Sequence, residues 1–415
     1  MTVGPVRVAI LGAGNRGADV YGRGLEGRGD AVVVAVADPD PLRRDRLAER
    51  HGVPSDRRFA GATELLSGPR IADLAILATP DAAHVQPAIL ALTRGYDVLL
   101  EKPIAPDAEG IRALAAAAAE AKGTVTVAHV LRHAPFFRTI REAMAHGRIG
   151  RPIGIDHVEN VGHWHFAHSY VRGAWRREAQ ASPMILAKAC HDLDLLRWLA
   201  DAPCDEVFSR GELRWFREEN APADAPPFCL DGCPVETDCP YSAPRIYLER
   251  FAGRRGWPRS VVAPGGGDDA VAAALRAGPY GRCVYRCDND VVDHQVATLS
   301  FANGVVATLT VTAFSEENTR TIRVFGSHGE LEGHLESGRI ALRDFASGGT
   351  ERLDVAPAQG HAPADRALLD DVIARLRGDA GPGPTDLATS LESHLVAFAA
   401  ERSRREGGPV RPAAR

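Results

Sequence analysis

Lys102 occupies a place in the chain that suggests proton chemistry. It stands in Glu101-Lys102-Pro103, directly after the short apolar segment 97–100. If that segment is a strand of a parallel sheet, Lys102 lies at the carboxyl edge of the sheet, where ligands bind. An amine there could bind a substrate hydroxyl or a cofactor carboxamide, and burial could lower its pKa enough for proton transfer. A solvated surface lysine is the alternative.

A second basic cluster falls in the predicted helix 183–199. His191 and Asp192 come three and four residues after Lys188, so a helix places all three on one face. An amine close to a second amine has a depressed pKa and can accept a proton near neutral pH. Lys102, Lys188 and His191 are therefore the candidate catalytic residues. A helix-surface lysine and a hydrogen-bonded structural histidine are the alternative.

Three glycines suggest a phosphate-binding turn. Gly12, Gly14 and Gly17 form a GxGxxG pattern after the apolar segment 6–11 and before a stretch of helical character. They permit a tight turn, the approach of a pyrophosphate and close packing of helix on strand. The next apolar segment ends on Asp38, about 20 residues later, where a carboxylate could bind the ribose hydroxyls of NAD. The pattern predicts a dinucleotide site, and a plain strand–helix turn is the alternative.

The loop 160–170 interleaves histidines with large aromatic side chains. Aromatic faces suit the C–H faces of a sugar ring, and imidazoles suit its hydroxyl edges. His163, His165 and Tyr170 are therefore candidate substrate-binding residues. A metal site and a packed aromatic loop are the alternatives, although no carboxylate or cysteine stands at ligand spacing within the loop.

Five of the seven cysteines fall between residues 229 and 287, where proline, glycine and turn residues dominate. Structural zinc sites use cysteines two to four residues apart, and an insert with little apolar periodicity needs such a cross-link. The sequence predicts zinc bound by Cys229, Cys233, Cys239 and Cys287, the last chosen over Cys283. Buried free thiols are one alternative, and a disulfide, which a reducing cytosol disfavours, is the other.

Strands and helices must alternate to position these residues in the first part of the chain. Apolar segments of strand character are found at 6–11, 31–37, 74–78, 97–100 and 124–128. Helical segments separate them, and the alternation indicates βαβ units with a parallel sheet. We predict a Rossmann NAD(P)-binding domain over residues 1–130.

The rhythm changes beyond residue 130. From residue 295 to 334 apolar and polar residues alternate as in half-buried antiparallel strands. We predict an α+β domain over residues 131–415 with a large, mainly antiparallel open sheet. It includes a cysteine-rich insert at about 200–290 and C-terminal helices at about 363–405.

Bulk composition limits the function classes. The chain has 415 residues, 45% hydrophobic and 25% charged, as expected for two or three globular domains. The net charge of −5 gives no basic patch for nucleic acid. No apolar run reaches the ~20 residues of a membrane span. The first strand starts so early that we expect no signal peptide and a cytoplasmic location.

The order and spacing of these motifs resemble the Gfo/Idh/MocA oxidoreductases, a family typified by glucose–fructose oxidoreductase and inositol dehydrogenase. The resemblance covers most of the chain, and residues 200–290 are its least typical part. It rests on the glycine pattern, Ala37-Asp38-Pro39-Asp40, Thr79-Pro80 with His84, Glu101-Lys102-Pro103, Gly147-x-x-Gly150, His191-x-x-Asp194 and Phe325-Gly326-Ser327-x-Gly329-x-Leu331.

The resemblance implies an NAD(P)-dependent oxidoreductase of a sugar, a cyclitol or a sugar derivative. In such enzymes hydride passes between a ring carbon and nicotinamide while a base removes the hydroxyl proton. The family lysine and histidine match Lys102 and His191, whereas its aspartate is replaced here by Ala187. The cofactor-binding residues implied are Gly12, Gly14, Asn15, Arg16, Gly17, Asp38, Thr79, Pro80, His84, Glu101 and Lys102.

Asp293 and His294 follow a polar run and enter an apolar strand. The resemblance turns this edge of the sheet toward the substrate, so we predict that both bind sugar hydroxyls together with Lys188 and His191. A turn cap explains the preceding run 288–290 equally well.

Two other functions fit the same residues. Some family members cleave glycosidic bonds through transient oxidation by retained NAD, and Ala187 with the histidine-rich loop favours that reaction. A non-catalytic NAD or sugar sensor is the other alternative. Asp38 favours NAD, because its carboxylate repels a 2′-phosphate, but Arg43 and Arg44 leave NADP open. The exposed face of the antiparallel sheet, through which relatives often pair, predicts a homo-oligomer, either a dimer or a tetramer.

Overall fold

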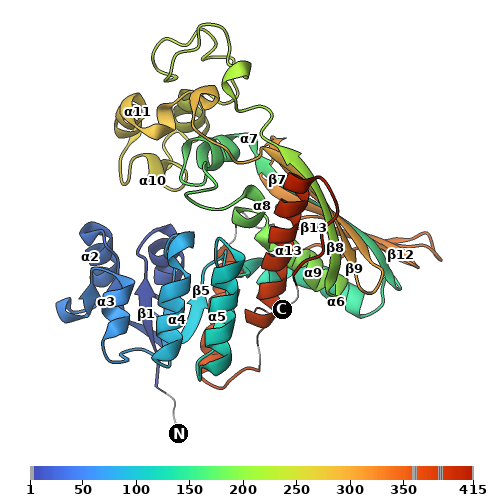
Figure 1. The fold of residues 1–415 in the computed structure, drawn as a ribbon, viewed down its shortest axis with the longest axis horizontal. Helices are drawn as coiled ribbons and strands as arrows, with labels where there is room; N and C mark the ends of the chain where they lie inside the picture. The colour runs from blue at the N-terminus through green and yellow to red at the C-terminus, as the bar shows by residue number, and fades with distance from the viewer. Residues whose placement is uncertain are drawn as a thin grey trace.

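The computed structural model describes residues 4–357, 360, 362–381, 383, 385 and 387–413. Two β-sheets organise the chain, one within residues 6–127 and the other within residues 152–352. In Figure 1 the N-terminus lies below the first sheet, whereas α8 Met184–Ala187 and the helices of a third group lie above it, namely α7 His163–Phe166, α10 Arg259–Val262 and α11 Asp268–Ala277. The carboxyl edge of the first sheet therefore faces this third group.

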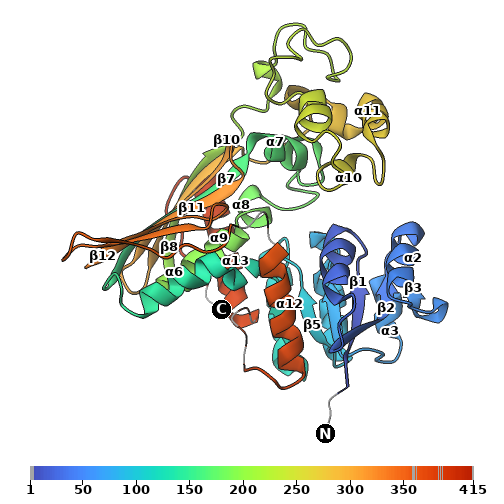
Figure 2. The ribbon, with the colours of Figure 1, turned by 180° about the vertical axis from the view of Figure 1, so that it is seen from behind.

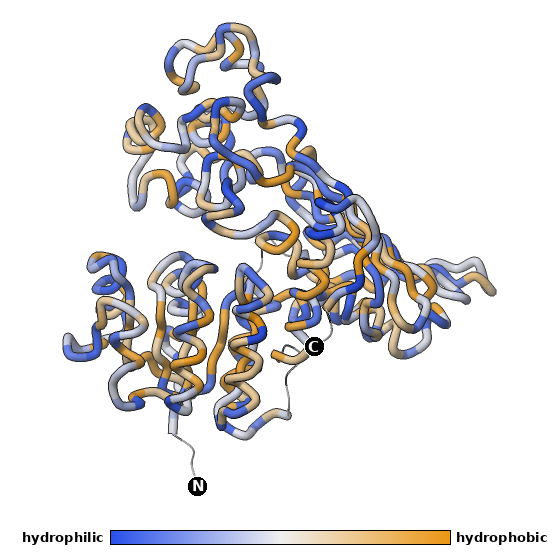
Figure 3. Tube along the Cα trace, viewed as in Figure 1, coloured by the Kyte–Doolittle hydropathy of each residue, from blue (hydrophilic) through white to orange (hydrophobic). Residues whose placement is uncertain are grey.

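The first sheet consists of six parallel strands in the order β3-β2-β1-β4-β5-β6. The order reverses between β1 and β4, and this switch point is where open α/β sheets bind ligands. Its strands are mainly orange in Figure 3, since helices cover both faces. The strands are β1 Val6–Leu11, β2 Ala31–Ala37, β3 Arg58–Phe59, β4 Leu74–Leu77, β5 Asp97–Leu100 and β6 Val125–Val127. The helices are a π-helical segment Asn15–Gly22, α1 Arg23–Leu25, α2 Pro41–Arg50, α3 Ala62–Ser67, α4 Val85–Thr93 and α5 Ala108–Glu120.

The second sheet has eight strands in the order β14-β13-β12-β11-β7-β10-β9-β8, antiparallel except for the parallel pair β7 and β10. The strands are β7 Pro152–Gly162, β8 Cys204–Glu212, β9 His294–Phe301, β10 Val306–Ser315, β11 Thr319–Gly326, β12 Gly329–His334, β13 Arg339–Asp344 and β14 Thr350–Arg352. The predicted fold class, a Rossmann domain followed by a large open antiparallel sheet, is confirmed.

Helices cover one face of the second sheet. They are α6 Pro135–Ala145, α9 Cys190–Ala200 and α13 Leu387–Glu406 (Figure 1). Alternate residues of β9 and β10 are buried, and the residues between them are more exposed on the opposite face. That opposite face carries partly exposed apolar side chains, namely Phe208, Val296, Val306 and Phe314.

The insert between β8 and β9 has an aromatic interior. Trp164, which follows β7, packs against Phe251 and Trp257 with ring centroids 4.7 and 5.4 Å away. The insert contains a π-helical turn Arg245–Arg250, α10 Arg259–Val262 and α11 Asp268–Ala277. Strand β8 lies in the region for which the sequence predicted little regular structure, because polar residues on its exposed face obscure the alternation.

The predicted continuous helix 183–199 is wrong. The segment forms two helices, α8 Met184–Ala187 and α9 Cys190–Ala200, which meet at Lys188 and Ala189. Ala189 has φ −95° and ψ 8°, outside the helical range. Lys102 Nζ donates to the carbonyl oxygen of Ala187, the last residue of α8, at 2.9 Å. The break thus joins the second half of the chain to the edge of the first sheet.

The helix α12, Ala362–Leu376, packs on the first sheet's domain although it lies near the end of the chain (Figure 2). Arg375 donates to Thr126 Oγ1 at 3.3 Å, and the carbonyl oxygen of Thr385 accepts the N–H of Val127 at 2.9 Å. The predicted domain boundary at residue 130 therefore separates the strands of the two sheets, but residues near the end of the chain also pack on the first domain. No helix in the described ranges is long and apolar enough to cross a bilayer.

Candidate active site

The turn after β1 has the shape that a dinucleotide phosphate requires. Gly12 has φ +97°, and a Cβ there would lie 2.4 Å from the carbonyl oxygen of Ala78. At Gly17 a Cβ would lie 1.8 Å from the carbonyl oxygen of Gly12. At Gly14, by contrast, no atom lies within 4 Å of a Cβ position, so the backbone is open. The helical segment Asn15–Gly22 begins at this opening, and the residues present fit an anionic diphosphate.

Asp38 closes the same turn from the end of β2. Its Oδ2 accepts the N–H of Ala13 at 2.6 Å, and its Oδ1 accepts the N–H of Asp40 at 2.8 Å. Arg44 donates to the carbonyl oxygen of Asp38 at 3.1 Å, and Arg43 pairs with Asp40 at 3.3 Å. Both arginines beside the carboxylate are therefore already engaged.

Arg16 and Glu101, both predicted to bind the cofactor, bind each other. Arg16 Nε donates to Glu101 Oε1 at 2.5 Å, and its Nη atoms donate to Asp365 of α12 at 2.7 and 3.1 Å. Tyr21 also donates to Glu101 Oε1, at 2.6 Å. Burial raises the pKa of Glu101, but Arg16 and Tyr21 outweigh it and hold the pKa below its usual range. The cluster fixes the loops after β1 and β5, and Tyr21 and Asp365 are members that sequence reasoning missed.

His84 is buried behind these loops. Its Nδ1 lies 2.7 Å from the carbonyl oxygen of Pro103, and its Nε2 lies 2.9 Å from that of Thr79. The Thr79 hydroxyl in turn donates to the carbonyl oxygen of Ala83 at 3.0 Å. His84 thus connects the turn at Thr79 and Pro80 to the cis peptide Lys102–Pro103. Its place suits support of a cofactor site better than direct contact.

Lys102 lies at the carboxyl end of β5 with its Nζ bonded to Ala187. Asp81, which follows β4, faces it, and its Oδ2 is buried without a hydrogen-bond partner. Burial raises the pKa of Asp81, and the opposing charges of Lys102 and His84 only reduce that rise. Sequence reasoning missed Asp81, although its position just after Thr79-Pro80 was the available signal.

Lys188 begins a buried chain of ions. Its Nζ lies 3.1 Å from Glu159 Oε1, and Arg320 Nη2 lies 2.6 Å from Glu159 Oε2. Arg320 Nε also donates to Asp192 Oδ1 at 2.7 Å, which lies 2.7 Å from His157 Nε2. Burial lowers the pKa of Lys188, and Glu159 opposes that shift. Arg320 and Glu159 lie on β11 and β7, far from Lys188 in sequence, and were missed.

His191 is buried in a cluster of histidines. Its ring centroid lies 5.7 Å from that of His129, which lies 5.6 Å from that of His394 on α13. His394 Nε2 accepts the N–H of Ile104 at 2.9 Å. Burial lowers the pKa of His129 to about 4 and that of His394 to about 3. His129 and His394 are therefore neutral imidazoles at neutral pH, and the charge of Lys102 lowers the pKa of both a little further.

Asp194 pairs with Arg132. Arg132 Nε and Nη2 donate to its two carboxylate oxygens at 2.6 and 2.7 Å. Burial raises the pKa of Asp194, but the charges of His129 and Arg132 outweigh it and leave the pKa lowered. Asp194 therefore anchors α9 to the end of the first sheet.

The predicted histidine-rich loop is helical, comprising α7 His163–Phe166 and the π-helical segment Ala167–Arg172. His165 and Tyr170 lie near the buried ions, His165 close to Lys188 and Tyr170 close to Glu159. Burial raises the pKa of Tyr170, and the nearby Glu159 raises it further. Burial also lowers the pKa of His165, with a further contribution from Lys188. His163 instead points to the carbonyl oxygen of Ser315 at 3.3 Å.

Asp293 is committed to the chain that leaves β8. Its Oδ2 accepts the N–H groups of Arg214 and Trp215 at 2.9 and 2.6 Å, and its Oδ1 lies 2.9 Å from His294 Nδ1. All three partners lie at the junction of the second sheet and the insert, so a structural role accounts for the carboxylate. His294 is partly exposed beside it.

The cysteines do not form a finished metal site. In the part of the chain that the structure describes, no three His, Cys, Asp or Glu side chains are arranged to hold an ion, so the predicted zinc site is not supported. Cys229, Cys233, Cys239 and Cys283 line one small cavity. Cys287, predicted as the fourth ligand, does not line this cavity, and its Sγ lies 3.3 Å from the carbonyl oxygen of Cys283.

Comparison with known families matches both halves of the chain. A model described as "Oxidoreductase family, NAD-binding Rossmann fold" matches residues 6–129. Its companion, "Oxidoreductase family, C-terminal alpha/beta domain", matches residues 141–411. Both belong to one family, whose model names read Gfo, Idh and MocA.

Individual relatives are similar at moderate identity. YteT of Bacillus subtilis is 26% identical over 322 residues, 72% of either chain. An inositol 2-dehydrogenase of Rubrobacter xylanophilus is 28% identical over 214 residues, which span 50% of this chain and 55% of that protein. An oxidoreductase of Agrobacterium radiobacter, solved with NAD+, L-tartaric acid and magnesium, has a TM-score of 0.70 at 16% identity over 98% of both chains. At that identity the solved structure shows the fold alone.

Proposed function

We propose that this chain, which belongs to the Gfo/Idh/MocA oxidoreductase family, transfers hydride between a ring carbinol carbon of a sugar, cyclitol or sugar derivative and NAD. The observation that carries the proposal is the meeting of two amines at the carboxyl edge of the first sheet. Lys102 is bonded to Ala187, and the next residue, Lys188, is paired with Glu159. Sugar and cyclitol hydroxyls suit such a cluster of donors and acceptors.

The cofactor fits the open backbone at Gly14 and the carboxylate of Asp38. NAD would supply hydride acceptance there. Asp38 disfavours a 2′-phosphate, and the two nearby cations already have partners, Arg44 in the carbonyl oxygen of Asp38 and Arg43 in Asp40. These contacts favour NAD over NADP.

Lys102 and Lys188 bind the oxygen of the reacting carbinol in this proposal. Two ammonium groups stabilise the negative charge that develops as the hydroxyl proton leaves. In this proposal Lys188, held 3.1 Å from Glu159 Oε1, donates to the substrate oxygen and is not the base. The proton passes to the imidazole of His191, since imidazole is the commonest general base. His165 and Tyr170 contribute further contacts to the sugar from the other side of the ion chain.

The proposal is tested with purified protein, NAD+ and a panel of sugars, cyclitols and sugar acids, with NADH followed at 340 nm. Lys102→Met should lower kcat by about 10³-fold, as expected for loss of a donor that stabilises the negative charge on the reacting oxygen. Lys122→Met is the matched control, because Lys122 is an exposed lysine outside the site. NAD+ affinity, measured by calorimetry, should stay the same in both variants.

Other outcomes point to other functions. Release of an aglycone without net NADH would favour redox-neutral glycoside cleavage by retained NAD. Normal binding of NAD+ and sugar without turnover, unaffected by Lys102→Met, would favour a sensor. An unchanged kcat for Lys102→Met in an active protein would remove the proposed role of the lysine.

The protein is further proposed to form a homo-oligomer through the open face of the second sheet. That face exposes Phe208, Val296, Val306 and Phe314 in neighbouring strands, and apolar surface of this kind is typical of subunit interfaces. Light scattering coupled to size exclusion should give a dimer or tetramer, and Phe314→Asp should reduce the measured mass to that of a monomer.

A further inference from the structure

Arg172 is a buried cation without a carboxylate partner. Its side chain is 1% exposed, and it donates to the carbonyl oxygens of Arg282 at 2.7 Å and Tyr241 at 2.8 Å. Its Nη2 also lies 3.7 Å from Cys229 Sγ. Within the described ranges, no salt bridge includes Arg172, whereas Arg320 and Arg132 have carboxylates. An isolated buried charge costs several kcal/mol, so an anion is expected beside Arg172.

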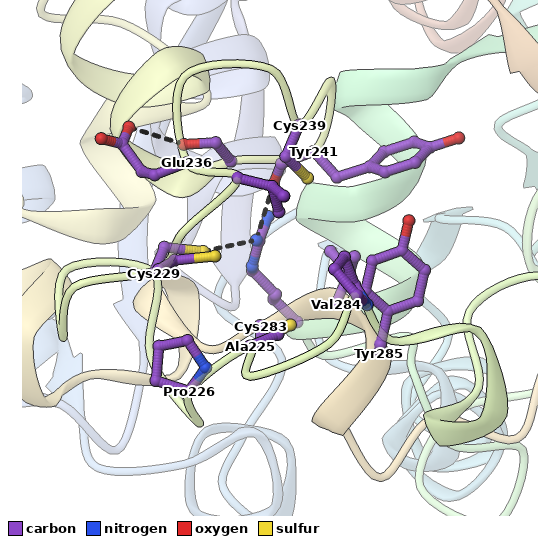
Figure 4. A pocket seen from close by; sticks show the side chains of 14 residues that line it. Ala225, Pro226, Cys229, Glu236, Cys239, Tyr241, Cys283, Val284 and Tyr285 are labelled. Carbon is purple, nitrogen blue, oxygen red and sulfur yellow. Dashed lines mark hydrogen bonds between the residues drawn. The ribbon is translucent and has the colours of Figure 1, made fainter.

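Four sulfurs surround a small cavity beside this guanidinium. Figure 4 shows Cys229, Cys239 and Cys283 gathered around it, and Cys233 also lines the cavity. The cavity volume is about 20 Å³. A single water-sized sphere needs ~10–15 Å³, so the cavity can hold one atom or ion but no organic ligand.

Backbone pairing brings the two cysteine segments together. The N–H of Cys229 donates to the carbonyl oxygen of Gly281 at 2.9 Å, and the N–H of Cys283 donates to that of Pro227 at 2.8 Å. An antiparallel bridge between Phe228 and Arg282 lies between these two bonds. The pairing places Cys229 opposite Gly281 and Cys283 opposite Pro227, so the two cysteines are diagonal neighbours although they are far apart in sequence.

The sulfur of Cys229 lies where N–H groups donate to it. Besides Arg172 Nη2, the N–H of Ala243 points at Cys229 Sγ at 3.5 Å. Hydrogen bonds of this kind to sulfur are typical around metal-bound cysteines. Cys287 differs, because it does not line the cavity and its Sγ lies 3.3 Å from the carbonyl oxygen of Cys283, closer than the 3.9 Å between Cys229 Sγ and the carbonyl oxygen of Arg282. Cys287 is therefore a thiol outside the cluster.

We propose that Cys229, Cys233, Cys239 and Cys283 bind one zinc ion as thiolates and that Arg172 is its buried counter-cation. Four thiolates on Zn²⁺ carry a net charge of −2, which supplies the anion that Arg172 lacks. The sulfurs line the cavity without sharing a coordination distance, so binding draws them in to ~2.3 Å from the ion. The ion then cross-links the two segments of the insert.

Metal analysis of the purified, full-length protein tests the proposal. Mass spectrometry should find one zinc per chain, and Co²⁺ exchanged into the site should give the intense sulfur-to-cobalt bands of a tetrathiolate. A protein that binds neither ion, with all seven cysteines reactive toward a thiol reagent, would overturn the proposal. Iron in place of zinc would overturn the choice of metal.

Substitutions identify the fourth ligand. Cys283→Ser should reduce zinc content at least 10-fold, whereas Cys287→Ser and the buried control Cys190→Ser should retain it. If Cys283→Ser fails to fold, cobalt spectra of Cys287→Ser still decide, since an unchanged tetrathiolate spectrum excludes Cys287. Loss of that spectrum in Cys287→Ser would contradict the assignment.

Arg172→Met tests the counter-cation. It should weaken zinc binding by about 10–100-fold, as loss of a group that supports metal ligands does, while the cobalt spectrum keeps its tetrathiolate form. Unchanged zinc affinity, measured by competition with a chelator, would show that Arg172 does not balance the negative charge of the zinc site.

Discussion

The edge of the first sheet and the cysteine-rich insert bury arginine in different ways. Beside this edge, Arg320 of β11 lies between the carboxylates of Glu159 and Asp192. The buried guanidinium therefore has anionic partners that the chain itself supplies. In the insert, Arg172 contacts carbonyl oxygens and a cysteine sulfur. The first arrangement is complete when the chain has folded. The second, as proposed above, is complete only with a metal ion.

The difference separates two sources of order in one protein. The edge is positioned by ions, hydrogen bonds and neutral histidines that the sequence itself supplies. The insert has few long apolar runs, and its segments are connected by backbone pairing and a cavity lined with thiols. A chelator should therefore affect the insert first and leave the geometry of Lys102 and Lys188 to the chain's own contacts.

Removing the cation of the closed network should give the largest effect on stability. Arg320→Met leaves Glu159 and Asp192 buried with unmatched charge, so we expect a loss of about 3–5 kcal/mol in the free energy of unfolding. Urea unfolding followed by circular dichroism measures it. Arg323→Met, at an exposed ion pair on the same strand, is the control and should cost at most about 1 kcal/mol. A loss below 1 kcal/mol for Arg320→Met would show that Arg320 is not needed to balance the buried carboxylates, and would remove the difference drawn between Arg320 and Arg172.

Acid should act next, through the neutral histidines at the edge. The pKa of His129 falls from 6.5 to about 4 on folding, and that of His394 to about 3, so the unfolded chain binds more protons between these values. The free energy of unfolding is therefore not reduced by these two histidines above pH 6.5. It falls as the pH is lowered from 6.5 toward 4, because the unfolded chain takes up the protons first. Between pH 7.5 and pH 5 we expect a loss of about 2 kcal/mol for each histidine.

The control for the acid effect is a matched pair of variants. His394→Gln keeps an acceptor for the N–H of Ile104 and should flatten the pH dependence of the unfolding free energy. His146→Gln, at an exposed histidine after α6, should leave the slope unchanged. Equal slopes in the two variants would exclude His394 as a source of the acid sensitivity.

The smallest expected effect concerns cofactor choice at the edge. Asp38→Asn removes the charge that opposes a 2′-phosphate but retains an acceptor for Ala13 N–H. The ratio of kcat/KM for NAD+ to that for NADP+ should fall by about 10-fold, or 1.4 kcal/mol. Steady-state kinetics with both cofactors measures the ratio. An unchanged ratio would place cofactor selection elsewhere in the site.

Local pattern was enough to predict the first sheet and the position of Lys102 at its carboxyl edge. Strand, glycine turn and helix follow one another within a few residues, and a parallel sheet brings successive strand ends to one edge. The partners of Lys188 could not be found in this way, because Glu159 and Arg320 come from strands that pair only in the folded second sheet. Likewise, the sequence offered no basis for preferring Cys283 to Cys287, whereas in the folded chain Cys283 lines the cavity with Cys229, Cys233 and Cys239.

The predicted helix through Lys188 failed for a related reason. Helical periodicity continues across residues 183–199, but the chain breaks where Lys102 bonds to Ala187. Such a contact between distant segments outweighs a local propensity of a few tenths of a kcal/mol per residue. Asp293 shows the same limit, since its backbone partners Arg214 and Trp215 lie beyond the reach of local pattern.

The packing of the last helices on the first sheet has a consequence for synthesis. Arg16 depends on Asp365 of α12, and the loop after Lys102 depends on His394 of α13. As the chain leaves the ribosome, the N-terminal sheet emerges first and is free to fold. Its ligand-binding loops, however, acquire these supports only after nearly all of the polypeptide has been made. The part of the site encoded earliest is thus completed among the last.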